Sequence, residues 1–130
     1  MGDIFKIREI GYLQKGLDMI LTRQNAVSAN IANSSTPGYK AIHVDFESKL
    51  KDAIKNTGMT ETNPRHLPNK AQGIYGVQPS VTTKLNGARP DGNTVNLEEE
   101  FSQSAVNGVD YQLYISALNS HMKNIMSSFE

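Results

Sequence analysis

The chain has 130 residues, and its 13 basic and 13 acidic side chains cancel to a formal net charge of zero. A neutral chain offers no basic stripe to nucleic-acid phosphates and no polybasic patch to an anionic membrane, which argues against both partner classes. It has no cysteine, which excludes disulfides and thiol chemistry. Asp3 and Glu9 interrupt the N-terminus and no run approaches ~18 apolar residues, so we expect neither a cleaved signal peptide nor a membrane span.

The first segment predicts a long helix over about residues 10–32. Its apolar positions recur at alternating steps of three and four residues, the heptad seam of a helix that packs against another helix. Gly16 interrupts this run of helix formers and costs roughly 1 kcal/mol relative to alanine. We expect the seam of this helix to consist of Ile10, Leu13, Leu17, Ile20, Val27 and Ile31, with Gln24 at its one polar position.

A helix stop and a tight turn follow in residues 30–40, the stretch we call the elbow. We expect Asn33 to end the helix in the left-handed conformation that asparagine tolerates. Pro37 and Gly38 suit the central pair of a type II turn, because proline presets the first torsion and glycine accepts a positive φ. We expect Tyr39 to pack against the helix end and to contact a neighbouring subunit. The candidate site residues of the elbow are Asn30, Asn33, Thr36, Pro37, Gly38, Tyr39 and Lys40.

The middle of the chain carries weaker signals. Apolar residues at helical spacing predict a short amphipathic helix over about residues 44–56. Residues 57–96 are rich in Asn, Pro, Gly and Thr, which favour turns and loops. Within them, the β-branched residues at 74–85, followed by the turn dipeptide Asn86-Gly87, indicate either a small β-hairpin or extended loops.

The last segment gives the strongest signal. Asn96 and Glu99 form a capping-box arrangement, and the run of glutamates at 98–100 suits the positive end of a helix. An unbroken repeat of four and three residues then predicts a helix to the C-terminus, with Ser104 and Gly108 as small seam residues. We expect the larger seam residues of this helix to be Leu97, Phe101, Tyr111, Ile115, Leu118, Met122, Ile125 and Phe129.

Together these segments predict a mainly α fold. Long N- and C-terminal helices pair as a coiled coil, and a loop-rich middle holds a short helix and a small β-hairpin. We divide the chain into residues 1–40, 41–95 and 96–130, with the two terminal segments forming one axial domain. Two helices bury too little apolar surface to offset the entropy of ordering them, so we expect other subunits to supply further surfaces. Apolar residues off the seam are candidates for those contacts: Tyr12, Met19, Leu21, Leu113 and Met126.

The sequence predicts no catalytic, cofactor-binding or metal-binding residues. His43, His66 and His121 lie in different segments, and none has a second ligand at helical spacing. There is no glycine-rich phosphate loop and no nucleophile elbow. Consecutive glutamates at 98–100 point in different directions on a helix, which favours a solvated helix start over a cation site.

Two stretches carry a family resemblance. The run Ala29-Asn30-Ile31-Ala32-Asn33, followed by Thr36-Pro37-Gly38-Tyr39-Lys40, resembles the N-terminal motif of the axial rod and hook proteins of the bacterial flagellum. Phe46 with Leu50, and the run from Asp91 to Glu98 that enters the last helix, are similar to the short proximal rod members of that family. Distal rod and hook relatives usually carry a Thr-Gly-Phe turn and larger insertions, which this chain lacks.

The resemblance implies a structural protein with no cofactor and no small-molecule substrate. Such proteins leave the cytoplasm through the flagellar type III export apparatus without signal cleavage, and they assemble in the basal body within the periplasm or cell envelope. The implied partners are further copies, other rod proteins, and the membrane-ring and adaptor subunits. The implied function is to transmit motor torque to the hook and filament and to line the export channel.

Two alternatives from other classes stay open. A coiled-coil binding or chaperone-like module that folds on a partner would contain similar helices, but it would form a closed complex of fixed size. A rod subunit would instead make heterologous contacts that continue along a helical assembly. The third alternative is a small enzyme, for which the sequence offers no site.

Overall fold

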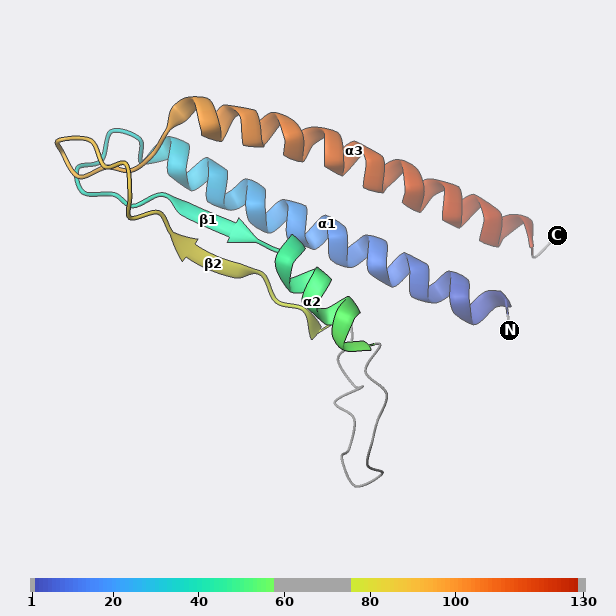
Figure 1. Ribbon diagram of the computed structural model, residues 1–130. Coiled ribbons are helices and arrows are strands. Elements are labelled where there is room, and N and C mark those ends of the chain that lie inside the picture. The colour runs from blue at the N-terminus through green and yellow to red at the C-terminus, as the bar shows by residue number, and fades with distance from the viewer. Residues whose placement is uncertain (1, 58–75, 129–130) are drawn as a thin grey trace, which may run out of the picture.

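The computed structural model describes residues 2–57 and 76–128, and we refer to these as the described residues. The elements in chain order are helix α1 (Gly2–Ala32), strand β1 (Ile42–Asp45), helix α2 (Glu47–Thr57), strand β2 (Ser80–Thr83) and helix α3 (Leu97–Ser127). Figure 1 shows α1 and α3 side by side in opposite directions, with the elbow at one end of the pair. The prediction of a mainly α fold with long terminal helices and a loop-rich middle that holds a short helix is confirmed, and the two strands form a small antiparallel sheet.

Helix α1 is the central element, because α3 contacts one side of it and β1 contacts another (Figure 1). Its buried residue Met19 forms a hydrophobic cluster with Phe46 and Val77, and Leu50 of α2 packs against this cluster. Burial of each such side chain contributes roughly 1.5–3 kcal/mol. We expected Met19 at a contact between subunits; this is wrong, because the middle segment of the same chain covers it.

The sheet has two antiparallel strands, with His43 opposite Thr82 and Val44 opposite Val81. Residues 44 and 45 were expected to begin a helix, but they belong to β1. The Asp45 carboxylate accepts a hydrogen bond from the backbone N–H of Ser48 at 3.2 Å, which caps the helix and delays its start to Glu47. The strand expected within residues 74–85 therefore pairs with β1 instead of forming a hairpin with a neighbouring strand.

Helix α3 begins where the sequence predicts. The Asn96 side chain accepts hydrogen bonds from the backbone N–H groups of Glu98 and Glu99, at 3.1 and 3.5 Å. The Glu99 carboxylate does not complete the capping box, because it bonds the Lys84 ammonium at 2.6 Å. The predicted seam residue Phe129, His66 and residues 58–75 of the loop-rich middle lie outside the described residues.

Candidate functional site

The elbow begins as a continuation of α1. Asn33 donates from its backbone to the carbonyl of Ala29 at 3.0 Å and from its side chain to the same carbonyl at 2.9 Å. No described residue other than glycine has a positive φ, so the left-handed ending expected at Asn33 is wrong. The helix needs no left-handed cap there, because Asn33 extends the ladder and its own carbonyl accepts from the Thr36 N–H at 3.0 Å.

The expected tight turn is present at Pro37 and Gly38. The backbone N–H of Tyr39 donates to the carbonyl of Thr36 at 3.3 Å, which closes a four-residue turn. Gly38 has a φ of 74°, as the third position of a type II turn requires. The chain therefore reverses within a few residues of the end of α1.

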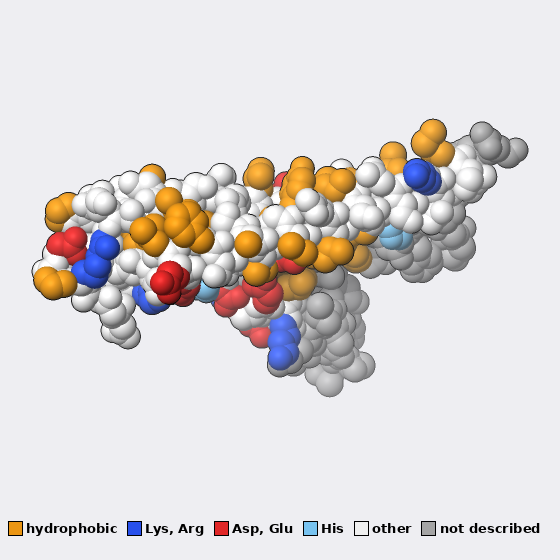
Figure 2. All heavy atoms as spheres, turned by 90° about the horizontal axis from the view of Figure 1, so that it is seen from above, with side chains coloured by type: hydrophobic (Ala, Val, Ile, Leu, Met, Phe, Trp, Pro, Cys, Tyr) orange, Lys and Arg blue, Asp and Glu red, His pale blue; other side chains and the backbone are white. Residues whose placement is uncertain are grey.

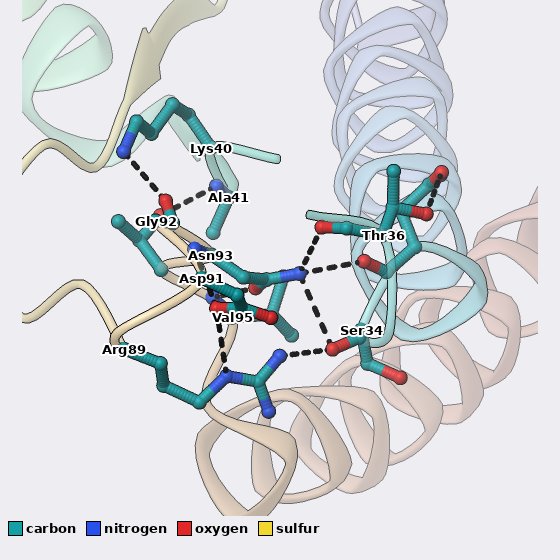
Figure 3. A network of polar contacts seen from close by, with 11 residues as sticks. Ser34, Thr36, Lys40, Ala41, Arg89, Asp91, Gly92, Asn93 and Val95 are labelled. Carbon is teal, nitrogen blue, oxygen red and sulfur yellow. Dashed lines mark hydrogen bonds and ion pairs between the residues drawn. The ribbon is translucent and has the colours of Figure 1, made fainter. Parts of the chain in front are cut away.

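The centre of the elbow is Asn93, which comes from the loop before α3 and has 0% exposure. Its amide Nδ2 lies 2.9, 3.2 and 2.8 Å from the carbonyl oxygens of Asn33, Ser34 and Thr36 (Figure 3). Its Oδ1 accepts from the backbone N–H of Val95 at 2.8 Å. One side chain thus binds three carbonyls at the end of α1, each of which also accepts a hydrogen bond from another donor.

The backbones of the elbow and of this loop also pair directly. The Gly38 N–H donates to the carbonyl of Asp91 at 2.8 Å, and the Thr94 N–H donates to the carbonyl of Tyr39 at 3.0 Å. The Ala41 N–H donates to the Thr94 hydroxyl at 2.8 Å. These bonds join residues more than fifty positions apart. The two stretches that carry the family resemblance therefore lie against each other. We call residues 30–41 together with residues 89–96 the clasp.

Two cationic side chains of the clasp add further hydrogen bonds between its two segments. The Lys40 ammonium donates to the carbonyl of Gly92 at 2.6 Å, and the Arg89 guanidinium donates to the carbonyl of Ser34 (Figure 3). A Cβ added at Gly92 would lie 3.4 Å from the Cα of Gly38. That is an ordinary van der Waals contact, but Gly92 has a φ of 81°, so a side chain there is disfavoured by backbone conformation.

Asn30 connects the clasp to the sheet and to α3, and it is only 1% exposed. Its side chain pairs with the backbone of Ile42 in both directions, with Oδ1 accepting from the N–H and Nδ2 donating to the carbonyl, each at 2.8 Å. Nδ2 also donates to the Glu100 carboxylate at 3.0 Å, and Oδ1 accepts from the Tyr39 hydroxyl at 3.2 Å. The Asn30 side chain therefore bonds the backbone of β1 as a neighbouring strand would, on the side of β1 that faces α1. Tyr39 contacts the end of α1 as expected.

Glu100 places a carboxylate in this buried junction, at 9% exposure. Burial raises the pKa of Glu100, and the nearby Glu99 charge adds to the increase, while the hydrogen bond from Asn30 opposes it. Burial and then the Glu100 charge also raise the pKa of Tyr39. A small cavity of about 60 Å³ borders Glu100, Val27 and His43, between α1, β1 and α3.

Beyond the clasp, α1 and α3 first meet through polar side chains. Gln24, the predicted polar position of the first seam, donates to the Ser104 hydroxyl at 3.1 Å. Its Oε1 accepts from the amide of Asn107 at 3.0 Å, and the Asn107 Oδ1 accepts from Gln103 at 3.2 Å. Asn107 is only 2% exposed. A fully bonded polar group inside a helix pair fixes the register of the two helices.

Further toward the open end of the pair, Gly16 faces Tyr114. A Cβ built on Gly16 would lie 2.0 Å from Cε1 of the Tyr114 ring. The aromatic ring therefore lies directly on the backbone of α1. The sequence showed Gly16 only as a weak point of the helix. In the structure, its missing side chain leaves the space that the Tyr114 ring occupies.

The predicted seam residues lie in two kinds of surroundings. Ile20 and Val27 are buried, and partial burial is found for Ile10, Leu13, Leu17, Ile31, Ile115, Leu118 and Ile125. A row along α3 is exposed in the single chain: Leu97 at 39%, Phe101 at 57%, Tyr111 at 45% and Met122 at 45%. We call these four residues the outer row; their place in a coiled coil stays a prediction.

Other apolar side chains of the two helices are also exposed. Three of the expected subunit contacts, Leu21, Leu113 and Met126, have exposures of 57%, 63% and 68%. Figure 2, which looks down on α3, shows hydrophobic side chains recurring along its length. A helix that is apolar on several faces is typical of one that is surrounded by other helices.

Other kinds of site find no support in the described ranges. No group of three or more His, Cys, Asp or Glu side chains there is placed to hold a metal ion. Within the same ranges, no helix combines the length and the apolar content that crossing a bilayer requires.

Comparison with known proteins places these features in a family context. The sequence profile described as "Flagella basal body rod protein" matches residues 14–40, which include the elbow. The flagellar basal body rod protein FlgB of Escherichia coli (strain K12) is 36% identical over 128 residues, covering 89% of this chain and 88% of that protein. FlgB of Salmonella typhimurium (strain LT2) is 35% identical over 131 residues, with the same coverage of 89% and 88%.

A third relative gives a similar result. FlgB of Buchnera aphidicola (subsp. Acyrthosiphon pisum, strain APS) is 32% identical over 126 residues, covering 93% of this chain and 94% of the relative. The likeness therefore extends far beyond the elbow and spans nearly the whole of each protein.

Proposed function

Because this chain belongs to the flagella basal body rod protein family, we propose that it is a structural subunit of the proximal rod. In this function it assembles with further copies, with other rod proteins and with membrane-ring and adaptor subunits of the basal body. It reaches the periplasm or cell envelope through the flagellar type III export apparatus, without cleavage of a signal peptide.

The outer row of α3 is the observation that carries the proposal of assembly. Leu97, Phe101, Tyr111 and Met122 are each more than a third exposed in the single chain. They all belong to the repeat of four and three residues along α3, which keeps them on one face of the helix, and the row contains no charge. Covering the outer row removes its apolar surface from water, and this burial contributes roughly 25 cal/mol per Å² of apolar area. The gain in free energy favours association with helices of neighbouring subunits.

The clasp supports the proposal that the subunit transmits torque. Torque passes along a rod only when each subunit resists twisting and bending. The clasp fixes one end of the α1–α3 pair through several backbone hydrogen bonds and through Asn93, while Gln24 and Asn107 hold the register beyond it. Under this proposal, residues 1–40 and 96–130 form one stiff axial domain, and it contributes to the wall of the export channel.

Leu21, Leu113 and Met126 give the subunit further apolar contacts outside the outer row. Their positions on both α1 and α3 allow one subunit to contact more than one neighbour. Heterologous contacts of this kind continue into a helical assembly instead of closing on a pair.

Electron microscopy of purified basal bodies tests the function directly. A copy of the chain with a small tag in the exposed loop at residues 85–88 replaces the native copy, and the tag is located with a labelled binder. We expect the label on the rod near the membrane ring. A tagged chain that supports swimming but is absent from the rod contradicts the proposal, and recovery in a closed complex of fixed small size favours the chaperone-like alternative.

A further inference from the structure

The chain contains two Asn-Gly pairs, Asn86-Gly87 and Asn107-Gly108. Such pairs are chemically labile when the backbone nitrogen of the glycine can reach the side-chain carbonyl carbon of the asparagine. Glycine permits this approach because it has no Cβ and adopts backbone conformations that other residues avoid. The surroundings of the two pairs therefore decide whether each one reacts.

Asn86-Gly87 lies in the exposed loop that follows β2, and both residues are exposed. Gly87 has a φ of 78°, and a Cβ built on it meets no atom within 4 Å, so the loop has room for a ring to form. The last bond to the sheet is made by the N–H of Lys84 and the next bond is made by the N–H of Arg89. Among the described residues, no backbone hydrogen bond holds the N–H of Gly87.

Asn107-Gly108 has the opposite surroundings. Asn107 is 2% exposed, its amide nitrogen donates to Gln24 at 3.0 Å, and its Oδ1 accepts from Gln103 at 3.2 Å. Gly108 lies inside α3, where its N–H belongs to the helical ladder. Both reacting groups are therefore occupied and held apart by the helix.

Asp91-Gly92 contains the same backbone arrangement with a carboxyl group in place of the amide. Here the N–H of Gly92 donates to the carbonyl of Arg89 at 2.8 Å. The Asp91 carboxylate accepts from the N–H of Asn93 at 3.0 Å. The clasp therefore holds this third pair in place as well.

We propose that Asn86 is a site of spontaneous deamidation, and that the fold protects the other two pairs. The Gly87 nitrogen attacks the Asn86 Cγ, forming a C–N bond and a five-membered succinimide as the Cγ–Nδ2 bond breaks and ammonia leaves with the Gly87 proton. Water then adds to one of the two ring carbonyls and opens the ring. The product is aspartate or, through the other carbonyl, isoaspartate, which carries one more carbon in the backbone.

The reaction adds a negative charge to a loop that two cations attach to the rest of the molecule. Lys84 bonds Glu99 of α3, and Arg89 bonds the carbonyl of Ser34 at the end of α1. A carboxylate at position 86 lies between these two cations in sequence and competes for them. The net charge of the chain changes from zero to negative, which alters the loop surface beside the clasp.

Peptide mapping by mass spectrometry tests the proposal on the full chain. The native protein is kept in mildly alkaline buffer at physiological temperature, and loss of amide is measured at both asparagines over time. We expect the product at Asn86 to appear at least roughly tenfold faster than at Asn107, because reaction at Asn107 requires local opening of α3. Equal rates in the native protein, or faster reaction at Asn107, overturn the proposal.

The same chain unfolded in urea provides the control. Without the fold, both Asn-Gly pairs have similar neighbours on their reacting side, so their rates should agree within about twofold when local opening is no longer needed. An Asn86→Gln variant should lose the fast product in the native state and keep the slow one. Persistence of the tenfold difference in urea shows that sequence, not structure, protects Asn107, and it overturns the protective role of α3.

Discussion

The two ends of the α1–α3 pair are held by different kinds of interaction. At the clasp, directional hydrogen bonds dominate, and Asn30, Asn93 and Glu100 are buried polar groups with partners. Toward the open end, the Tyr114 ring lies against the backbone of Gly16. Hydrogen bonds are directional, so they specify one register of the two helices. Packing contacts are individually weak and less directional. The comparison indicates that hydrogen bonds at the clasp set how the two helices pair there, and apolar surface of α3 is exposed in the single chain.

The largest expected effect is at the clasp. Asn93→Ala removes the amide that serves the carbonyls of Asn33, Ser34 and Thr36, and it removes the acceptor for the Val95 N–H. Losing these hydrogen bonds and leaving the buried Val95 N–H without its acceptor lowers the free energy of unfolding by about 3 kcal/mol. Urea unfolding followed by circular dichroism measures the change. Asn86→Ala, in an exposed loop, is the matched control and should change it by less than ~0.5 kcal/mol.

A smaller effect is expected at the open end, where one substitution type gives opposite signs at two glycines. Gly16→Ala places a methyl group 2.0 Å from a Tyr114 ring carbon, and the overpacking outweighs the gain in helix propensity, for a net loss of about 1 kcal/mol. Gly108→Ala meets no atom within 4 Å, so it should stabilise α3 by roughly 0.5–1 kcal/mol. Thermal unfolding compares the two. Shifts in the same direction contradict the close contact at Gly16.

The smallest effect depends on pH and again concerns the clasp. The raised pKa of Glu100 means that the folded state holds a proton there more tightly than the unfolded state does. The stability associated with that proton is present at acidic pH and is lost as pH rises from the ordinary glutamate range through the raised pKa. Glu100→Gln keeps an oxygen for Asn30 and removes the ionisation. The stability of this variant relative to the native chain should therefore increase with pH over that window.

Glu98→Gln provides the control for this pH series, because Glu98 is an exposed residue one position before the Glu99–Glu100 pair. It removes the same formal charge from the first turn of α3 without touching the buried junction. Equal pH dependence of the two variants, measured as the change in melting temperature across the series, contradicts a special role for Glu100.

The features that the sequence predicted are those that local residues determine. The start of α3 was predictable because Asn96 caps a helix within three residues of itself. The turn was predictable because Pro37 and Gly38 fix their own torsions. Gln24 was identifiable as the polar position in the first seam, although its partners on α3 were not.

The features that were missed arise from contacts between distant parts of the chain. Strand β1 depends on a partner strand about forty residues away and on the Asn30 amide, so its short sequence looked like the start of a helix. Asn93 has a role only when its loop reaches the end of α1. A local signal was its place directly after Gly92, whose positive φ marks a turn of the chain. The exposed row on α3 was indistinguishable from a covered one, because periodicity does not say which face meets α1.

The most direct test of the central claim, that the outer row of α3 binds neighbouring rod subunits, is incorporation of a Phe101→Asp variant into basal bodies. Phe101 is 57% exposed, so the variant should fold with a free energy of unfolding within about 0.5 kcal/mol of the native chain. Gln78→Asp adds the same charge at an exposed polar position outside α3 and is the matched control. We expect the Gln78 variant to be recovered in purified basal bodies at the native level and the Phe101 variant to be lost from them. Native-level recovery of both contradicts the assigned function of the outer row.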